Sequence, residues 1–385
     1  MGSHHPVLVI GAGLSGLTTA LALNKLGIPV RVVEQARALG EVGAGLTLSR
    51  GTMRCFEWLG LADTVIAQSE PSVAVPFLHY QTGKLLRAAP PANAEATARQ
   101  LHRADLHDLL VSALRSRGSD ILLGHQLTGI TQQPQSVTAL FSNGGSLQAQ
   151  LLIGCDGVRS SVRELVFPER GHAVFAGQVA FRCLVPGHLA QPWLSAGRGA
   201  VYVGPGCTIN RYALRNGAIV NCVGLARTSA WQQEGWSTPA TNAEFLAQFA
   251  DWHPDVTGLI KAAPADGIIK WALFEHLPMA GWSRNRIALA GDAAHPMLPF
   301  LGLGAAMAIE DGVIVARALA QQATAEAALA AYEATRLPRT RQIFELSRRQ
   351  GELLQTTSPD SYSTAAAPAH DAALFDFDPT QELGA

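Results

Sequence analysis

Cysteine is scarce in this sequence, and so is any spacing that would hold a metal. Only five cysteines occur among 385 residues, and no two of them form a Cys-x-x-Cys pair. An odd number of widely spaced cysteines predicts neither a disulfide framework nor a zinc site. We therefore expect a protein with reduced cysteines and no metal centre.

Excess charge and long apolar runs are lacking as well. The 29 Lys and Arg residues nearly balance 30 Asp and Glu residues, which leaves a formal net charge of −1. Such a balance offers no broad basic surface to nucleic acid or to an anionic membrane. No apolar run is long enough to span a bilayer, and the first residues show no signal-peptide pattern. We expect a cytoplasmic protein with no nucleic-acid partner and no stable membrane association.

What the sequence does contain begins with a dinucleotide-binding pattern. A short aliphatic run at 7–10 predicts a strand buried on both faces, and Gly11-Ala-Gly13-Leu-Ser-Gly16 follows it. Such glycines permit a tight turn, close approach of the backbone to a diphosphate, and close packing of the next helix. That helix spans 14–26, and a second strand ends at Glu34, where an acidic residue can bind a ribose hydroxyl. Glycines alone are weak evidence, but the whole unit predicts a dinucleotide site rather than a βαβ unit without a ligand.

Two later segments have a similar form, a buried strand that ends beside a glycine and an aspartate. The first leads to Asp156-Gly157, followed by Arg159, and the second leads to Gly291-Asp292. Ligands of open α/β sheets bind at such carboxyl ends of strands. A helix that we expect to begin at Ala305 would add free backbone N–H groups and partial positive charge. These features suit a phosphate or an anionic heteroaromatic ring.

The remaining segments follow other patterns. Strand-like runs between 173 and 275, separated by turn signals, predict an antiparallel sheet, and residues 73–86 predict a hairpin. We expect Glu310 and Asp311 to cap or pair locally. We expect residues 324–350 to form one or two amphipathic helices, whose Arg-rich end is either a solvated face or an oligomer contact. The last residues, 358–385, predict a loosely held tail that is docked by its aromatic side chains.

With its three segments in this order, the chain resembles the class A flavoprotein aromatic monooxygenases, which include para-hydroxybenzoate, salicylate and 6-hydroxynicotinate hydroxylases. The resemblance covers nearly the whole chain. It depends on the GxGxxG motif, on Asp-Gly followed by Arg, and on Gly-Asp-Ala-Ala-His-Pro. Arg103 in an Arg-x-Asp-Leu context, the Gly43-Ala-Gly45 turn and residues 374–378 also match. The resemblance implies bound FAD, NADH or NADPH that binds transiently, and O₂ as co-substrate.

The fold class implied by the resemblance is α/β, with a Rossmann-like FAD-binding domain interleaved with an antiparallel β-sheet substrate domain and C-terminal helices. We expect the FAD-binding domain to be discontinuous, at 1–72, 100–172 and 276–345. The substrate domain would occupy 73–99 and 173–275, and a C-terminal helix end and tail would occupy 346–385.

The resemblance also implies how FAD is held. Glu34 would bind the adenosine ribose, and Leu127 would supply backbone near the adenine. Arg103 and Asp292 would contact the pyrophosphate and ribityl region. The residues expected to bind the cofactor are Gly11, Gly13, Ser15, Gly16, Glu34, Gln35, Arg103, Leu127, Asp156, Asp292, Gly302, Gly304 and Ala305.

The sequence departs from the family's pattern in its polar pocket residues. Related hydroxylases often have a histidine where this chain has Thr47, Thr208 and Phe300, and a glutamine where it has Leu303. Such polar groups help to deprotonate a phenol, and a general base must lie within hydrogen-bond reach of the proton. Their replacement predicts a more apolar pocket, for a larger or already electron-rich ring.

The candidates left to handle a substrate proton are Tyr212, together with Thr47 or Thr208, and the backbone carbonyl of Pro299. Arg182 and Arg211 either pair with a substrate carboxylate or are structural. The residues expected to line the pocket are Thr208, Phe300, Arg211 and Arg182.

The activity implied by the resemblance is that of an FAD-dependent monooxygenase. It would use NADH or NADPH and O₂ to hydroxylate an aromatic or heteroaromatic substrate through a C4a-hydroperoxyflavin. Two alternatives stay open. One is a flavin oxygenase that performs Baeyer–Villiger, N-oxygenation or epoxidation chemistry on a bulkier natural product, and the other is a non-catalytic flavin-binding protein. We expect a monomer or a homodimer.

Overall fold

The computed structural model describes residues 5–40, 45–72, 75–89, 98–229, 238–368, 371–381 and 383. Its first large sheet has six strands in the order β19-β20-β12-β1-β2-β8. Their bounds are β1 Val7–Ile10, β2 Val30–Val33, β8 Ile121–Leu122, β12 Leu151–Gly154, β19 Ser283–Arg284 and β20 Ile287–Leu289. All neighbours are parallel except β19 and β20. The residues of β1 are at most 4% exposed, as expected for an aliphatic strand in the centre of a covered sheet.

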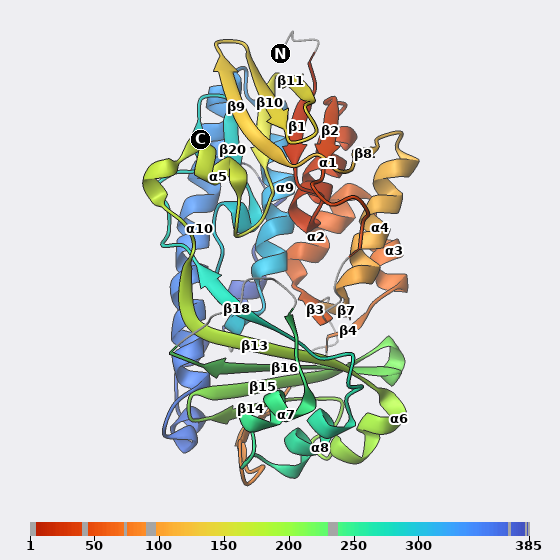
Figure 1. Cartoon of the computed structure of the whole chain (residues 1–385), viewed down its shortest axis with the longest axis vertical. Helices are drawn as coiled ribbons and strands as arrows, with labels where there is room; N and C mark the ends of the chain where they lie inside the picture. The colour runs from red at the N-terminus through yellow and green to blue at the C-terminus, as the bar shows by residue number, and fades with distance from the viewer. Residues whose placement is uncertain are drawn as a thin grey trace.

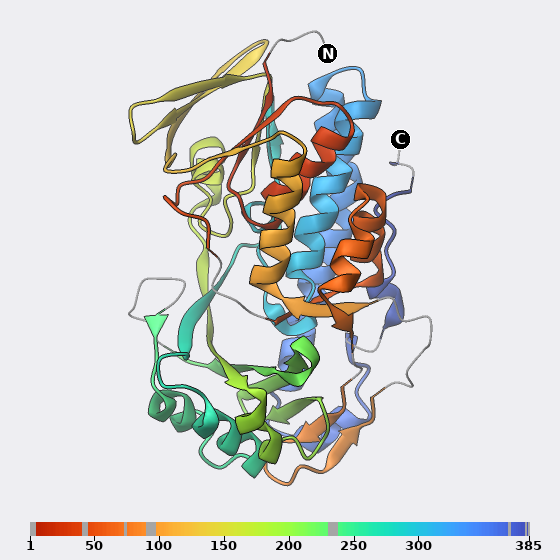
Figure 2. The same cartoon turned by 90° about the vertical axis from the view of Figure 1, so that its right-hand side faces the viewer.

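Helices lie on one side of this sheet, and a small antiparallel sheet lies on the other side (Figures 1 and 2). The helices are α1 Leu14–Lys25, α2 Arg50–Leu59, α3 Ala62–Ala67, α4 Arg103–Ser116 and α9 Gly304–Gln321. The small sheet comprises β9 Leu127–Gln133, β10 Ser136–Phe141 and β11 Ser146–Ala149. α1 and α9 approach closely at Gly312, where a Cβ atom would lie 2.7 Å from the backbone nitrogen of Thr19.

The second large sheet has eight strands in the order β17-β18-β13-β16-β15-β14-β5-β6. Their bounds are β5 Phe77–His79, β6 Leu85–Arg87, β13 Val174–Pro186, β14 Gly199–Gly204, β15 Cys207–Leu214, β16 Ile219–Arg227, β17 Thr238–Pro239 and β18 Ile269–Glu275. The pairs are antiparallel as predicted, except that β5 runs parallel to β14. No short turn joins these two strands, so tertiary packing sets their relative direction. The outer face is covered by α6 Gly187–Ala190, α7 Asn242–Ala247 and α8 Pro254–Ala262 (Figure 1).

A fourth sheet, which also has three strands, lies between the two large sheets. It has the order β3-β7-β4, with bounds β3 Gly45–Leu48, β4 Glu70–Pro71 and β7 Arg99–His102. Gly45 pairs with His102, and Thr47 pairs with Gln100. Because side chains alternate along a strand, these four residues share one face of the sheet. The opposite face carries Leu46, Leu48 and Leu101, which pack into the core of the first part.

The C-terminal region agrees with the expectation of one or two helices. It forms one helix, α10 Ala325–Leu354, which runs past both large sheets (Figure 1) and contains Pro338. The tail is tied down by polar contacts as well as by an aromatic ring. Arg317 donates to the carbonyl oxygens of Pro379 and Gln381, and the Arg339 guanidinium lies 4.3 Å from the ring centre of Phe377. The tail is therefore anchored rather than loosely held.

Short elements complete the fold. They are α5 Ser161–Val166, η1 Pro168–Arg170, η2 Gln191–Trp193, η3 Arg215–Gly217, η4 Gly291–Ala293, η5 Pro299–Leu301, η6 Pro359–Ser363 and η8 Ala372–Phe375. The expected α/β fold class is confirmed, whereas the proposed domain boundaries stay a prediction. In the described part of the chain, every helix is too short or too polar to cross a bilayer.

Candidate active site

The glycine-rich turn between β1 and α1 packs tightly against the end of β12. Gly11 has a φ of +100°, and a Cβ atom there would lie 2.6 Å from the carbonyl oxygen of Cys155. A Cβ atom at Gly16 would lie 1.9 Å from the Gly11 carbonyl oxygen, whereas one at Gly13 would meet no atom within 4 Å. The first and third glycines are therefore required by packing. The open side at Gly13 leaves room for a ligand against the backbone.

The carboxylate of Glu34 lies against the same turn. It accepts hydrogen bonds from the backbone nitrogens of Ala12 and Ala36, each at 2.9 Å. The backbone nitrogen of His125 donates to the Glu34 carbonyl oxygen at 2.9 Å, which brings the start of β9 at Leu127 close by. Gln35, the residue after Glu34, is exposed. A carboxylate has about four lone-pair sites, so Glu34 keeps acceptor capacity for ribose hydroxyls.

Asp156 has a local structural role. Its carboxylate accepts hydrogen bonds from the Ser160 hydroxyl at 2.5 Å and from the Val162 backbone nitrogen at 3.0 Å. Burial raises the pKa of Asp156, and these hydrogen bonds oppose the shift. Ser160 and the first turn of α5 engage the side chain, and the expected cofactor contact through the carboxylate stays a prediction. The carboxylate shapes the turn at Gly157.

Asp292 follows β20 in η4, and its side chain is open to solvent. Crowding by the surrounding protein nevertheless raises the pKa of Asp292, against the opposing charges of His295 and Arg103. Arg103 comes from the first turn of α4, so the fold brings the charges of two distant segments within range of each other. Ser15 of α1 packs beside Gly291, where a Cβ atom would lie 2.9 Å from the serine Cβ.

A buried ionic network supports the turn at Gly291 from behind. The side chain of Asp311 is fully buried and lies 2.7 Å from the Gly291 backbone nitrogen, which donates to it, and 2.6 Å from Nε2 of His295. Arg336 of α10 donates to Asp311 at 2.6 Å and to Glu310 at 2.7 Å. Burial alone would raise the pKa of Asp311, but the charges of His295 and Arg336 outweigh it and lower the pKa to about 2.

This network corrects two expectations. Glu310 and Asp311 pair with arginines that lie 25 to 29 residues further along the chain, and not locally. Arg336 and Arg339 are 0% and 9% exposed, so this part of the Arg-rich segment is core rather than a solvated face. Two helices that pack together bring these distant charges into contact, which no local spacing could indicate.

The N-terminus of α9 presents open backbone. The helix begins at Gly304, one residue before its predicted start, and it has no side-chain cap and no acidic residue in its first turn. Cβ atoms at Gly302 and Gly304 would meet no atom within 4 Å. Free N–H groups and partial positive charge, shared with Ala305, therefore face accessible space. A flat ring that gains negative charge would be stabilised there.

The loop before α9 packs onto the eight-stranded sheet. Phe300 belongs to an apolar cluster with Ala180 and Leu225, and a Cβ atom at Gly351 would lie 2.5 Å from its ring. The apolar character predicted from Phe300 is therefore present, and Leu303 is buried nearby among other apolar side chains. The Pro299 carbonyl already accepts a hydrogen bond from the Gly302 nitrogen at 2.9 Å, so one lone pair remains for a substrate.

Side chains on β15 point to two opposite faces. Thr208 and Tyr212 alternate with Arg211, which lies on the face under α7 and α8 together with Ile209. Arg211 is 1% exposed, donates to the Gly197 carbonyl oxygen at 2.7 Å and lies 3.7 Å from Asp255. The expectation that Arg211 lines the substrate pocket is therefore wrong. These contacts agree with the other alternative, that Arg211 is structural.

Tyr212 lies against the β3-β7-β4 sheet, since a Cβ atom at Gly45 would lie 2.5 Å from the Tyr212 hydroxyl oxygen. Burial raises the pKa of Tyr212, so this phenol stays protonated near neutral pH. Arg182 shares the inner sheet face, and its guanidinium lies 5.6 Å from the ring centre of Trp271. The Thr208 hydroxyl donates to the Tyr202 carbonyl oxygen at 2.8 Å, and that bond occupies its proton.

Sequence reasoning missed His102. By the register of β3 and β7, His102 lies on the same face as Thr47. Its exposure is 8%, and neither ring nitrogen has a hydrogen-bond partner among the residues that the structure describes. No local pattern signals this, because a missing partner is a tertiary property. The Gly43 and Ala44 part of the expected glycine turn lies outside the described residues.

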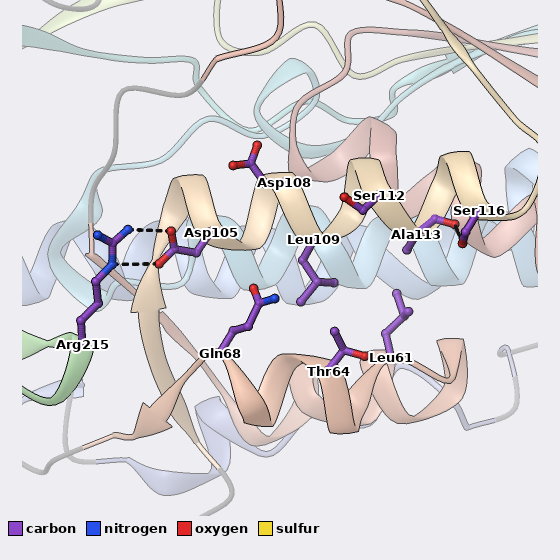
Figure 3. A pocket seen from close by; sticks show the side chains of 10 residues that line it. All are labelled: Leu61, Thr64, Gln68, Asp105, Asp108, Leu109, Ser112, Ala113, Ser116 and Arg215. Atoms are coloured by element: carbon purple, nitrogen blue, oxygen red, sulfur yellow. Dashed lines mark hydrogen bonds and ion pairs between the residues drawn. The ribbon is translucent and has the colours of Figure 1, made fainter.

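An open groove of about 740 Å³ lies elsewhere, between α3 and α4 (Figure 3). Arg215 closes one end by a two-point ion pair with Asp105, at 2.7 and 3.2 Å. None of the residues predicted to bind cofactor or substrate lines this groove. The ion pair matters here because it ties η3 to the first turn of α4, next to His102.

Comparison with known proteins places this geometry in context. The family model described as "FAD binding domain" matches residues 4–347. The 3-amino-4-hydroxybenzoate 2-monooxygenase of Streptomyces platensis is 33% identical over 357 residues, which cover 91% of this chain and 88% of that protein. The 6-hydroxynicotinate 3-monooxygenase of Bordetella bronchiseptica is 31% identical over 382 residues, which cover 94% and 96%.

A solved structure is also similar. Klebsiella pneumoniae HpxO complexed with FAD and uric acid superposes with a TM-score of 0.86 at 23% identity, covering 98% of this chain and 97% of that one. This likeness supports the fold. The two curated relatives extend the likeness to sequence over nearly the whole chain.

Proposed function

The chain belongs to the FAD binding domain family, and on that premise we propose that it hydroxylates an aromatic acid that carries a ring hydroxyl or amino group. It is a flavoprotein monooxygenase that uses FAD, NADH or NADPH, and O₂ to hydroxylate aromatic substrates. The substrate class, the roles of single residues and the choice of nicotinamide cofactor are the proposal.

The site residues fit FAD. The open side of the turn at Gly13 suits a diphosphate, Glu34 suits a ribose, and the uncapped start of α9 suits a flat ring. We assign Arg103 and Asp292 to the middle of the cofactor, because their charges interact between the two ends of the site. When bound, FAD passes electrons from the nicotinamide cofactor to O₂, one atom of which enters the substrate.

The chain's own residues then provide position and electrostatics. The N–H groups at Gly304 and Ala305 would stabilise negative charge on the bound ring. The apolar cluster around Phe300 excludes water from the adjoining sheet face. The observation that carries the proposal is this arrangement, in which one loop packs on the inner sheet face through Phe300 and leads directly into the open N-terminus of α9.

The substrate class follows from the charge on that face. Arg182 is a cation on the inner face of β13, next to Trp271, and we assign it to a substrate carboxylate. The names of both curated relatives specify hydroxylated aromatic carboxylates as their substrates. Tyr212 and Thr47 would line the far side of the same space, and the remaining lone pair of Pro299 would accept from a ring hydroxyl.

The first experiment uses the purified protein as isolated. Its visible spectrum should be that of a flavin. Oxidation of NADH and NADPH, followed together with O₂ uptake, should be stimulated by some hydroxylated or aminated benzoates and pyridine carboxylates, but not by the same rings without a carboxylate. Stimulation by ketones alone would favour Baeyer–Villiger chemistry on a bulkier substrate. Bound flavin with no stimulation by any compound would favour a non-catalytic flavin protein.

Two further predictions accompany the function. The oligomeric state, monomer or homodimer, is testable by light scattering. A cytoplasmic location is testable by cell fractionation.

A further inference from the structure

His102 is a buried imidazole without a structural task in the described part of the protein. It is 8% exposed, and neither Nδ1 nor Nε2 forms a hydrogen bond with a described residue. Buried polar groups are bonded in the great majority of cases, and an exception calls for an explanation. His102 is also the N-cap residue of α4, but its side chain caps no backbone N–H group.

The strand pairing of His102 places its imidazole on the side of the β3-β7-β4 sheet that meets Tyr212. It pairs with Gly45 across β3 and β7, and Tyr212 packs directly on Gly45. The backbone nitrogen of Gly45 also donates to the side chain of Asn221 at 3.0 Å, which fixes the β3-β7-β4 sheet against β16. His102 and Thr47 therefore share the face that meets the inner side of the eight-stranded sheet.

Other candidates on this face are poor proton acceptors. Burial raises the pKa of Tyr212, and a threonine hydroxyl does not titrate near neutral pH. Two other histidines near the cofactor segments are engaged, since Nε2 of His107 lies 2.8 Å from the Ala12 carbonyl oxygen and Nε2 of His295 lies 2.6 Å from Asp311. Each of these two rings has one nitrogen engaged, whereas neither nitrogen of His102 has a hydrogen-bond partner among the described residues.

The charges around His102 favour the neutral imidazole. Burial lowers the pKa of His102, Asp105 of the same helix raises it, and Arg215 of η3 and Arg182 of β13 lower it further. Much of the Asp105 charge is offset by its ion pair with Arg215. Arg103, the next residue, adds another positive charge on α4. A neutral imidazole can accept a proton, which a histidinium cannot.

We propose that His102 is the catalytic residue that accepts the proton of the substrate's ring hydroxyl. This inference rests on the proposed function and names the proton acceptor at that site. One ring nitrogen of neutral His102 takes the proton from the O–H group, which leaves a phenolate and an imidazolium. The proton then passes to solvent, and the neutral imidazole is restored. The positive charge of Arg182 nearby stabilises the phenolate.

The test measures ionisation of a bound phenol in the oxidised, FAD-loaded protein, without turnover. The probe is 4-hydroxy-3-nitrobenzoate, which carries the carboxylate assigned to Arg182 and whose phenolate is distinguished from the phenol by its visible absorbance. With wild-type protein, the bound probe should ionise at a lower pH than the free probe. With His102→Gln and His102→Asn, its apparent pKa should rise by about one unit or more, a tenfold change in the ionisation equilibrium. The matched control is His172→Gln, at a side chain that is 83% exposed, and it should match wild type.

Kinetics supply the second readout. With a substrate identified by turnover, kcat/KM of His102→Gln should fall about 100-fold and lose the acid limb of its pH profile. FAD affinity should change less than twofold. Two variants are used so that a folding defect in one, detected by its flavin spectrum and thermal unfolding, leaves the other informative.

Several results would overturn the inference. Loss of FAD, or a changed flavin spectrum without ligand, together with unchanged ionisation of the bound probe, would make His102 a cofactor contact. No bound-probe signal in wild type, or the same pH profile in both proteins, would remove its catalytic role. If the variants change probe ionisation but no aromatic compound is turned over, the proposed function fails while the role of His102 as a proton acceptor stands.

Discussion

Replacement of Asp311 by asparagine tests how the fold holds the turn at Gly291. Asp311 is fully buried and accepts from Gly291, His295 and Arg336 at 2.6 to 2.7 Å. An asparagine amide has the same shape, but its NH₂ group would face at least one of these donors. The Arg336 guanidinium would then keep only Glu310 as a carboxylate partner.

The magnitude follows from this geometry. Breaking a buried ion pair by removing one partner costs about 3–5 kcal/mol. For 385 residues at roughly 2.1 cal/mol/K each, the unfolding entropy is about 0.8 kcal/mol/K, so Tm should fall by about 4–6 °C. FAD should bind about tenfold more weakly, because the Gly291 hydrogen bond that orders the Asp292 turn is lost.

The same substitution makes a prediction about pH. The pKa of Asp311 is about 2 in the folded protein, below the ordinary 3.8 of an aspartate. Because folding lowers this pKa, the ionised carboxylate contributes fully to the free energy of unfolding above pH 3.8, and this contribution disappears as pH falls towards 2. The difference in unfolding free energy between wild type and Asp311→Asn should therefore be constant from neutral pH to about pH 5 and shrink below about pH 4.

The assays are thermal unfolding by circular dichroism, urea unfolding across pH, and FAD titration by fluorescence. The matched control is Asp360→Asn, which removes an exposed carboxylate 3.0 Å from Lys84 and should shift Tm by less than about 1 °C. If Asp311→Asn behaves like this control and keeps normal FAD affinity, the network does not support the turn and the reasoning is refuted.

Four other predictions follow from the structure. Gly11→Ala should be purified without FAD, as judged by its absorbance, because a side chain at φ +100° would collide with the Cys155 carbonyl; a normal flavin content would contradict this. Arg211→Met should cost about 2–4 kcal/mol in urea unfolding, because it leaves Asp255 without its arginine. Arg182→Met should instead raise KM for carboxylate substrates at least about tenfold with little change in stability, and the opposite pattern would reverse our assignment of the two arginines. Burial and the positive charge of Arg163 lower the pKa of His276 to about 4. The unfolded chain therefore binds this proton at a higher pH than the folded protein, and the free energy of unfolding should fall as pH drops from about 6.5 to 4. His276→Gln should lack this loss, and equal slopes in wild type and variant would contradict the prediction.

Much of the fold could be predicted because its signals are local. The buried strand, the glycine turn and the helix that follows are contiguous, and Glu34 comes directly after the next strand. Packing that only glycine permits at Gly11 and Gly16 is therefore visible in the sequence as well as in the structure. The parallel pairing of β5 with β14 carries no such local signal.

In the candidate site, the sequence contains a signal for the position of Arg211 but none for the surroundings of Asp311 or His102. Arg211 and Tyr212 are neighbours on a strand, and strict alternation places their side chains on opposite faces of the sheet, so the sequence itself indicates that they do not line the same pocket. The partners of Asp311, and the lack of hydrogen-bond partners for His102 among the described residues, depend on how distant elements pack, and no spacing in the sequence reveals them.

As an aromatic monooxygenase, this chain should insert one atom of O₂ into an aromatic ring. This is measured in a reaction with isotopically labelled O₂ in unlabelled water, with NADH or NADPH and the aromatic compound that stimulates their oxidation most strongly. We expect a ring-hydroxylated product that is heavier by one labelled oxygen atom. A product without the label, or hydrogen peroxide with no oxygenated product from any compound, would contradict it.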